Sequence, residues 1–349
     1  MKQFQVRNIN SGAVFSVNEG ESILNAALRQ GVMLPYSCKN GTCGSCKGQL
    51  ESGEVHYPFH PPLALSREEI GEGSALLCQA EPTGDLVIRV REIEAVRDIL
   101  IRKMPARVTE KTQLTRDVMR IKIKLPSAQR LQFLAGQYLE ILLPEGKRRA
   151  FSIASPPQSE DEIELHIRHV DGGGFTGWVF DEMKERDILR LEAPLGNFFI
   201  RNDQLDRPMI LMGGGTGFAP LKSMIEDLLA QRDKRPLHLF WGASSHADLY
   251  MHKQAQLWAE QNEHIQYSSA LLEAGDAAST ASFNGFVHHA VLQKYPDLAN
   301  FDIYMSGPPA MIDASRDAFL ENGAVKRRIF FDSFEFGLDV PIRVLAKSH

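Results

Sequence analysis

Residues 38–46 read Cys-Lys-Asn-Gly-Thr-Cys-Gly-Ser-Cys, and this stretch holds three of the four cysteines in the chain. Cys38 and Cys43 enclose four residues, Cys43 and Cys46 enclose two, and Cys78 follows after 31 more. The spacing C-x4-C-x2-C with a distant fourth cysteine is the ligand pattern of a [2Fe-2S] cluster. Small residues between the cysteines let backbone N–H groups point at the cluster and tune its potential. We therefore predict a one-electron centre with the ligands Cys38, Cys43, Cys46 and Cys78.

Two other uses of cysteine fit this pattern less well. Structural zinc sites favour paired C-x2-C units, and the sequence has one such unit. Disulfides belong to oxidising compartments, and the opening Met1-Lys2-Gln3-Phe4 shows no secretory signal. We therefore expect reduced cysteines in a soluble, cytoplasmic protein.

The residues around the cysteines predict a small α+β domain. Residues 4–6 and 15–17 alternate as strand residues do. Ser22 can cap a short helix that stops at Gly31, and residues 86–91 read as a closing strand. This order resembles a plant-type ferredoxin domain over residues 1–92, and the resemblance implies a β-grasp fold.

Length and composition bound the rest of the chain. A length of 349 residues predicts two or three domains. The net charge of −5 argues against a nucleic-acid partner, which would need a basic surface. No run of 18 apolar residues occurs, so no membrane span is expected. We expect domains or segments at 1–92, 93–103 (a linker), 104–203, 204–337 and 338–349 (a tail).

The second domain shows mainly strand patterns. Apolar residues at 119, 121, 123 and 125 alternate with Arg120, Lys122 and Lys124, a basic stripe that we interpret as a solvated strand face. Residues 136–143 are a further strand candidate. Short strands separated by turns predict a small antiparallel barrel.

Two short motifs in this domain suit a flat, phosphorylated cofactor. Residues 149–152 read Arg-Ala-Phe-Ser, so Arg149 and Phe151 share one face of a strand. The planar fork of arginine suits a pyrophosphate, and the phenylalanine ring can stack on a flat ring system. Glycines at 172–174 precede Thr176 at an expected helix start, where exposed backbone N–H groups bind phosphate.

The third domain begins with a strand, a glycine turn and a helix. Residues 209–212 are apolar, 213–217 read Gly-Gly-Gly-Thr-Gly, and the following helix buries apolar residues from Leu221 onward. This order is typical of dinucleotide binding. The turn is not G-x-G-x-x-G, however, and the next strand, 237–241, has no acidic residue at its end. The usual fingerprint therefore fails.

In this order the motifs resemble the ferredoxin–NADP reductase superfamily. That family carries Arg-x-Tyr-Ser, the turn Gly-Gly-Gly-Thr-Gly-x-Ala-Pro and a late Cys-Gly-Pro-Pro-x-Met. This chain has matching stretches at 149–152, 213–220 and 306–311, and an ending Phe-Asp-Ser-Phe at 331–334. Phe151 replaces the usual tyrosine and loses its hydroxyl contact. Ser306 replaces the usual cysteine beside the nicotinamide.

The resemblance implies cofactors, site residues and fold. It implies that FAD is held by Arg149, Phe151, Ser152, Ile167, Arg168, His169, Gly173, Gly174, Thr176 and Phe334. It implies that the nicotinamide dinucleotide is held by Gly213, Gly214, Gly215, Thr216, Gly217, Gly307 and Pro308. The implied catalytic residues are Ser152, Ser306 and Asp332. The expected fold is multidomain, α+β and α/β, with a β-grasp ferredoxin domain, an antiparallel β-barrel FAD domain and a parallel α/β nicotinamide-binding domain.

The sequence after the second strand of the third domain bears on coenzyme choice. NADP requires a cation for its 2′-phosphate. Residues 243–248 contain no arginine or lysine, and Asp248 would repel a phosphate. We therefore predict that the coenzyme is NADH.

The domain order resembles two groups of reductases. One comprises the reductase components of aromatic-ring dioxygenases and multicomponent monooxygenases. The other is CDP-6-deoxy-Δ3,4-glucoseen reductase, whose partner is a pyridoxamine-dependent dehydrase; the segments 36–38 and 168–170 favour this branch. Both imply electron flow from NADH to FAD, to the [2Fe-2S] cluster and to a partner protein. A passive electron carrier and a self-sufficient reductase of a small molecule remain alternatives.

Overall fold

The computed structural model describes residues 2–37, 39, 41–58, 62–96, 99–126, 131–159, 162–273 and 282–334. Cys38 and the predicted tail 338–349 lie outside the described residues. The chain divides into two compact units, residues 1–100 and 101–349. No helix among the described residues is both long and apolar enough to cross a membrane.

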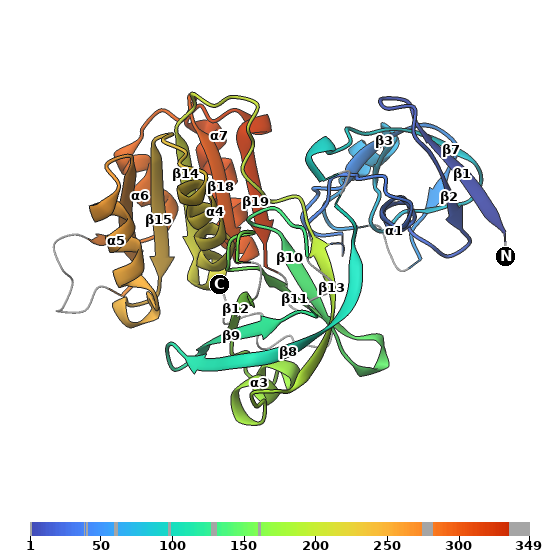
Figure 1. Cartoon of the computed structure of the whole chain (residues 1–349). Helices are drawn as coiled ribbons and strands as arrows, with labels where there is room; N and C mark the ends of the chain where they lie inside the picture. Colours follow the sequence, from blue (N-terminus) through green and yellow to red (C-terminus); the bar gives the residue numbers. More distant parts are fainter. Residues whose placement is uncertain are drawn as a thin grey trace. The chain divides into compact units, whose positions relative to one another are not determined.

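The first unit, drawn in blue in Figure 1, contains a five-stranded sheet, a two-stranded sheet of β4 and β6, and helices α1 and α2. The strand order of the five-stranded sheet is β2-β1-β7-β3-β5, with β1 and β7 parallel. The elements of the unit are β1 (Gln3–Asn8), β2 (Val14–Asn18), α1 (Ile23–Arg29), β3 (Lys47–Ser52), β4 (Val55–His56), α2 (Arg67–Gly71), β5 (Ser74–Leu76), β6 (Glu81–Pro82), β7 (Leu86–Arg89) and η1 (Glu94–Val96). This arrangement is the β-grasp fold that the sequence predicts.

Helix α1 fixes the segment that carries the fourth cysteine. The Ser22 side chain accepts a hydrogen bond from Asn25 N, as a capping residue does. The backbone N–H groups of Ile23 and Leu24 donate to Ala80 O and Leu77 O, at 3.0 and 2.8 Å. The start of the helix thereby holds the backbone on both sides of Cys78.

The second unit begins with a six-stranded antiparallel sheet. Its strand order is β11-β10-β13-β8-β9-β12. Its elements are β8 (Arg102–Gln113), β9 (Val118–Lys124), β10 (Tyr138–Leu142), η2 (Pro144–Gly146), β11 (Arg148–Ser152), β12 (Glu162–Arg168), α3 (Gly174–Asp181) and β13 (Ile188–Leu195). A bridge between Ile153 and Leu165 joins the two edges of the sheet and closes it into the predicted barrel.

The basic stripe on β9 is partly solvated and partly paired. Lys124 is exposed, whereas Arg120 and Lys122 are half-buried. Both side chains are only about a third exposed or less, and both form ion pairs with Glu110 on β8. The carboxylate comes from the neighbouring strand, so the pattern of β9 alone could not reveal it.

The rest of the second unit is a six-stranded parallel sheet, ordered β17-β16-β15-β14-β18-β19, with helices on both faces (Figure 1). One core packs α4 and α5 against the sheet, and another packs α6 and α7. Its elements are β14 (Met209–Gly214), η3 (Gly215–Gly217), α4 (Phe218–Ala230), β15 (Leu237–Ala243), η4 (His246–Asp248), α5 (His252–Gln261), β16 (Ile265–Leu271), β17 (Ser282–Asn284), α6 (Val287–Lys294), β18 (Asp302–Gly307), α7 (Pro309–Glu321), η5 (Lys326–Arg328) and β19 (Ile329–Ser333).

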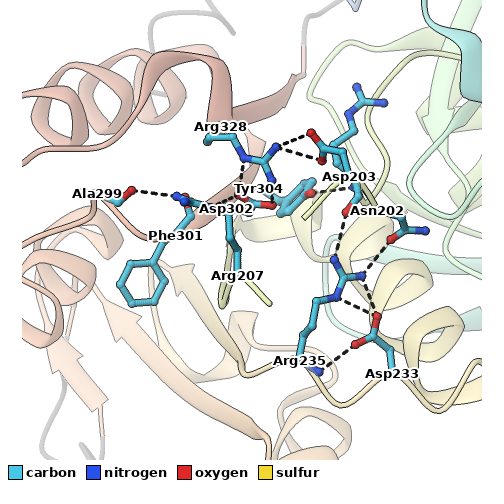
Figure 2. Close-up of polar contacts among 11 residues, drawn as sticks. Asn202, Asp203, Arg207, Asp233, Arg235, Ala299, Phe301, Asp302, Tyr304 and Arg328 are labelled. Atoms are coloured by element: carbon cyan, nitrogen blue, oxygen red, sulfur yellow. Dashed lines mark hydrogen bonds and ion pairs between the residues drawn. The ribbon is translucent and has the colours of Figure 1, made fainter. Parts of the chain in front are cut away.

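A buried ion-pair network holds the amino ends of β18 and β19 (Figure 2). Asp302, fully buried at the start of β18, accepts hydrogen bonds from Arg328 and from Arg207. Arg328, which directly precedes β19, also binds Asp203 in the segment that leads from the barrel to the parallel sheet. Nearby, Tyr304 accepts from the backbone N–H of Arg201 at 2.8 Å. The network therefore ties the connecting segment to the two strands.

Candidate functional site

The cysteine loop lies between two other segments of the first unit. Ala64 N donates to Gly41 O at 3.2 Å, and Leu77 N donates to Cys46 O at 3.1 Å. Gly41 has φ +87°, and a Cβ there would lie 3.0 Å from Pro62. The loop therefore needs glycine at this position both for its backbone conformation and for its packing.

The described cysteines suit a cluster. Cys46 and Cys78 are buried, Cys43 is half-buried, and none forms a disulfide among the described residues. Burial, with a smaller contribution from the charges of Cys46 and Cys78, raises the pKa of Tyr57. Within the described part of the chain, no three His, Cys, Asp or Glu side chains surround one point. A [2Fe-2S] cluster does not require that, because each iron takes two cysteines.

The flavin-side motif lies on β11. Arg149 is half-buried and its Nη1 donates to the backbone O of Arg148 at 2.8 Å. Phe151 is half-buried, and its ring packs 5.7 Å from that of Phe175 at a tilt of 40°. Ser152 is buried, and its Oγ donates to Asp332 Oδ2 at 3.3 Å. The strand thus presents a cation, a ring and a hydroxyl in sequence.

The turn between β12 and α3 is shaped for a phosphate. Thr176 Oγ1 accepts from Val170 N at 3.1 Å and donates to Gly173 O at 3.2 Å, so this hydroxyl holds the turn together. Helix α3 begins at Gly174 without a side-chain cap, and a Cβ at Gly174 would meet nothing within 4 Å. Uncapped N–H groups at an open helix start fit an anion. This fits the pyrophosphate of FAD.

The three residues at the end of β12 point in different directions. Ile167 is fully buried in the barrel core. His169 lies edge-on to Phe180 at 5.1 Å, and its Nδ1 lies 3.7 Å from Asp171. Arg168 pairs with Asp117 at 3.5 Å, while its buried Nε has no partner among the described residues.

The glycine turn after β14 is packed against the turn after β18. A Cβ at Gly217 would collide with Ser306 O, and one at Gly214 would lie 2.5 Å from Met311 Sδ and 3.3 Å from Pro308 Cδ. A Cβ at Gly213 would lie 3.0 Å from Leu221 Cδ1. Packing therefore requires glycine at 217, where the obstacle is backbone, whereas Gly213 and Gly214 face mainly the ends of flexible side chains.

Gly215 faces a different neighbour. A Cβ there would lie 3.1 Å from Arg168 Nη2, which comes from the barrel. Trp241 Nε1 donates to Gly215 O at 3.0 Å, and the Trp241 ring stacks on Phe218 at 3.9 Å. No sequence pattern singles out Trp241, because its contact with the turn depends on the pairing of β14 with β15.

The predicted catalytic residues converge at the carboxyl ends of β18 and β19. Ser306 and Asp332 are paired in register on these strands, and Asp332 accepts from Ser152 of the barrel. Phe334 N donates to Gly307 O at 2.9 Å. Ser306 Oγ is fully buried and has no partner among the described residues. A buried hydroxyl without a partner, next to the carboxylate that binds Ser152 of β11, fits a nicotinamide ring at the ends of these strands.

The region after β15 bears on coenzyme choice. Asp248 is buried, and its Oδ2 accepts from the backbone N and the Oγ of Ser245, both at 2.9 Å. These two hydrogen bonds fix the Asp248 carboxylate against Ser245. No arginine or lysine occurs in residues 243–248, all of which the structure describes.

Comparison with known proteins covers all three parts of the chain. Family models match at residues 7–83 (2Fe-2S iron-sulfur cluster binding domain), 105–200 (oxidoreductase FAD-binding domain) and 211–317 (oxidoreductase NAD-binding domain). The predicted [2Fe-2S], FAD and NAD cofactors are thereby confirmed.

Relatives and solved structures match over almost the full length. A CDP-6-deoxy-L-threo-D-glycero-4-hexulose-3-dehydrase reductase of Yersinia pestis is 37% identical over 93% of this chain and 96% of its own. The reductase component of phenol 2-monooxygenase of a Pseudomonas species is 37% identical over 94% of each. The structure of an Amycolatopsis cytochrome P450 reductase superposes with a TM-score of 0.81 and 35% identity, covering 95% of this chain and 98% of that one. The chain therefore belongs to the iron–sulfur flavoprotein reductases, electron-transfer oxidoreductases that join a [2Fe-2S] ferredoxin domain to FAD- and NAD-binding domains.

Proposed function

We propose that this reductase takes electrons from NADH and delivers them, through FAD and the [2Fe-2S] cluster, to a separate partner protein. The convergence of Ser152, Ser306 and Asp332 carries the proposal, because it joins the flavin strand to the ends of the nicotinamide sheet. When bound, FAD takes a hydride and releases its electrons singly, and the cluster carries one electron at a time.

The chain's own residues would orient the reacting rings. Ser152 would lie on the flavin side, and Ser306 with Asp332 on the nicotinamide side. Phe151 would stack on the isoalloxazine, and Phe334 would lie over its other face. Arg149 would hold the FAD pyrophosphate together with the open start of α3, where Gly174 leaves room. These roles rest on position and chemistry, and each can be tested by substitution.

NADH is the coenzyme that the NAD-binding domain favours. A 2′-phosphate after β15 would meet Ser245 and, behind it, the carboxylate of Asp248. Without a cation the phosphate would lose hydration and gain no charged partner. The 2′-hydroxyl of NADH needs only a neutral hydrogen bond, which Ser244 and Ser245 can offer.

The partner we propose is a pyridoxamine-dependent sugar dehydrase. The name of the Yersinia relative describes that protein as the reductase of a CDP-6-deoxy-hexulose 3-dehydrase. The second candidate is an oxygenase component, because the phenol monooxygenase reductase is equally identical. A cytoplasmic location belongs to the proposal, since thiolate ligands persist in a reducing compartment.

Mixing experiments separate these partners. NADH should first bleach the visible absorbance of the purified protein anaerobically; a passive carrier would not respond. The reduced protein is then mixed with a dehydrase loaded with its sugar-nucleotide intermediate, or with an oxygenase component, and reoxidation is followed. Rapid reoxidation by the dehydrase alone supports the first candidate, and by the oxygenase alone the second. Turnover of a sugar nucleotide without any partner would contradict the requirement for one.

A further inference from the structure

One face of β12 is polar and points away from the barrel core toward the NAD-binding domain. Glu164, His166 and Arg168 alternate along the strand and therefore share this face. Glu164 Oε1 lies 3.5 Å from Lys222 Nζ of α4, and His166 Nδ1 lies 3.0 Å from Tyr250 Oη. The strand thus forms a seam between the two domains of the second unit.

His166 connects the two sides of this seam. Its Nε2 lies 2.7 Å from Glu164 Oε1, and its side chain is fully buried. Burial lowers the pKa of His166, although Glu164 opposes the shift, so the ring is neutral. Burial works against ionisation of Glu164, but the hydrogen bond from His166 and the charge of Lys222 bring its pKa to about 2. The ionised carboxylate can only accept, which assigns the His166 proton to Nε2.

The tautomer fixes the direction of the contact with Tyr250. Nδ1 of His166 must accept, so the Tyr250 hydroxyl donates across the seam. Burial raises the pKa of Tyr250, which keeps this donor protonated. A directed chain therefore runs from Tyr250 through His166 to Glu164, and no member can reverse without breaking it.

Tyr250 also contacts the residues that hold the glycine turn. Its ring lies edge-on to Trp241 at 5.1 Å and to Phe218 at 5.8 Å. Trp241 in turn donates to Gly215 O at 3.0 Å. The hydroxyl that crosses the seam is therefore two contacts away from the turn predicted to hold the dinucleotide.

We propose that the Tyr250–His166 hydrogen bond is a positioning contact that sets the NAD-binding domain on the FAD barrel for hydride transfer. The proposal rests on the proposed function. Other contacts also cross the seam, such as Lys222 Nζ to Ala154 O and Ser223 Oγ to Ser155 O. They keep the domains together when the hydroxyl is lost, so its removal should change their alignment rather than separate them.

Two other partly buried tyrosine–histidine bonds offer a matched control. Tyr295 Oη lies 3.0 Å from His238 Nδ1, and Tyr267 Oη lies 2.9 Å from His252 Nδ1. Both bonds lie within the NAD-binding domain. Among the described residues, the bond of Tyr250 is the one tyrosine–histidine bond that joins the two domains.

The test compares Tyr250→Phe with Tyr295→Phe in the full-length protein containing FAD and cluster. Anaerobic stopped-flow mixing with NADH gives the limiting rate of flavin bleaching and the apparent Kd for NADH. We expect Tyr250→Phe to lower the limiting rate about fivefold, the factor that one neutral hydrogen bond supplies. The Kd should change less than about twofold, because the NAD-binding domain itself is intact. Tyr295→Phe should leave both values unchanged, which a general loss of stability would not do.

A second pair of variants tests the bond rather than the residue. In a His166→Phe background the partner of the hydroxyl is gone, so Tyr250→Phe should have no further effect on the limiting rate. Equal losses in Tyr250→Phe and Tyr295→Phe, a loss confined to Kd, or additive losses in the double variant would overturn the proposal. An unmodified protein that NADH cannot bleach would instead overturn the proposed function, so the two failures are distinguishable.

Discussion

Replacing Asp302 by asparagine should destabilise the second unit severely. The carboxylate is fully buried and accepts hydrogen bonds from Arg328 at Nε and Nη2 and from Arg207 at Nε. Asparagine keeps the size of the side chain but removes the charge, and its amide N–H would oppose a guanidinium donor. Among the described residues, Asp203, which is 60% exposed, would be the one charged partner left to Arg328. Removing one partner of a buried ion pair costs about 3–5 kcal/mol.

Thermal unfolding followed by tryptophan fluorescence is the appropriate assay. The three tryptophans, Trp178, Trp241 and Trp258, all lie in the unit of residues 101–349, so the signal excludes the first unit. For a unit of this size the expected loss lowers Tm by roughly 6–20 °C. Asp313→Asn is the matched control, because Asp313 pairs with Arg316 at 3.0 Å but is 63% exposed. It should change the stability by less than about 1 kcal/mol.

Either of two results would refute a dominant effect of the buried charge on stability. One is an Asp302→Asn protein that melts within about 2 °C of the unmodified protein, well below the shift expected for this loss. The other is an equal loss in Asp313→Asn. In both cases the stability would not follow the burial of the carboxylate.

Four further predictions concern the cofactors and pH. Cys43→Ser should lose iron and the low-temperature EPR signal of the reduced cluster while NADH still bleaches the flavin, because a hard oxygen replaces a soft thiolate; unchanged iron content would contradict the ligand assignment. Arg149→Ala should weaken FAD binding by about 1.5–3 kcal/mol, seen as flavin lost on gel filtration with the cluster retained. With ferricyanide as acceptor, kcat/KM for NADH should exceed that for NADPH by at least about tenfold. Ser245→Arg should lower this ratio. Equal values of kcat/KM for the two coenzymes in the unmodified protein would contradict the NADH assignment. Burial, aided by the charge of Lys294, lowers the pKa of His238 to about 4 from an ordinary 6.5. The stabilisation from the neutral ring is therefore complete above pH 6.5 and is lost as the pH falls toward 4, a change of about 3 kcal/mol at most. Denaturation curves of His238→Gln should lack this pH dependence of the unfolding free energy.

Features with a short-range physical cause could be predicted from the sequence. The cysteine spacing is set by what one loop can wrap around a cluster. The apolar run at 209–212 followed by glycines predicts a strand and a turn, and β14 indeed spans Met209–Gly214. The helix that follows buries Leu221, Met224 and Ile225 as its periodicity indicates.

Features that depend on pairing between distant segments could not be predicted. Ser152 and Asp332 are 180 positions apart and meet only because the barrel packs on the parallel sheet. The ion pairs of Arg120 and Lys122 cannot be read from the stripe on β9 alone, because the register of β8 and β9 brings Glu110 beside it. The glycines of the turn read as binding residues, whereas Gly217 is also required by the close approach of the β18 backbone at Ser306.

The carboxyl ends of β18 and β19 carry the candidate site residues, and their amino ends carry a buried ion pair. Their carboxyl ends hold Ser306 and Asp332, which would have to keep their positions beside the flavin strand within a fraction of an ångström for efficient hydride transfer. Their amino ends are held by Arg328 and Asp302, a buried pair that costs desolvation and adds little net stability over an apolar pair. Such a pair is better explained by the geometry that it enforces: a guanidinium fork binds a carboxylate in one orientation. Because paired strands are stiff, a fixed register at one end sets the register at the other. The Arg328–Asp302 pair and the Tyr250–His166 contact would therefore both restrain the site, one through the strands and one through the barrel.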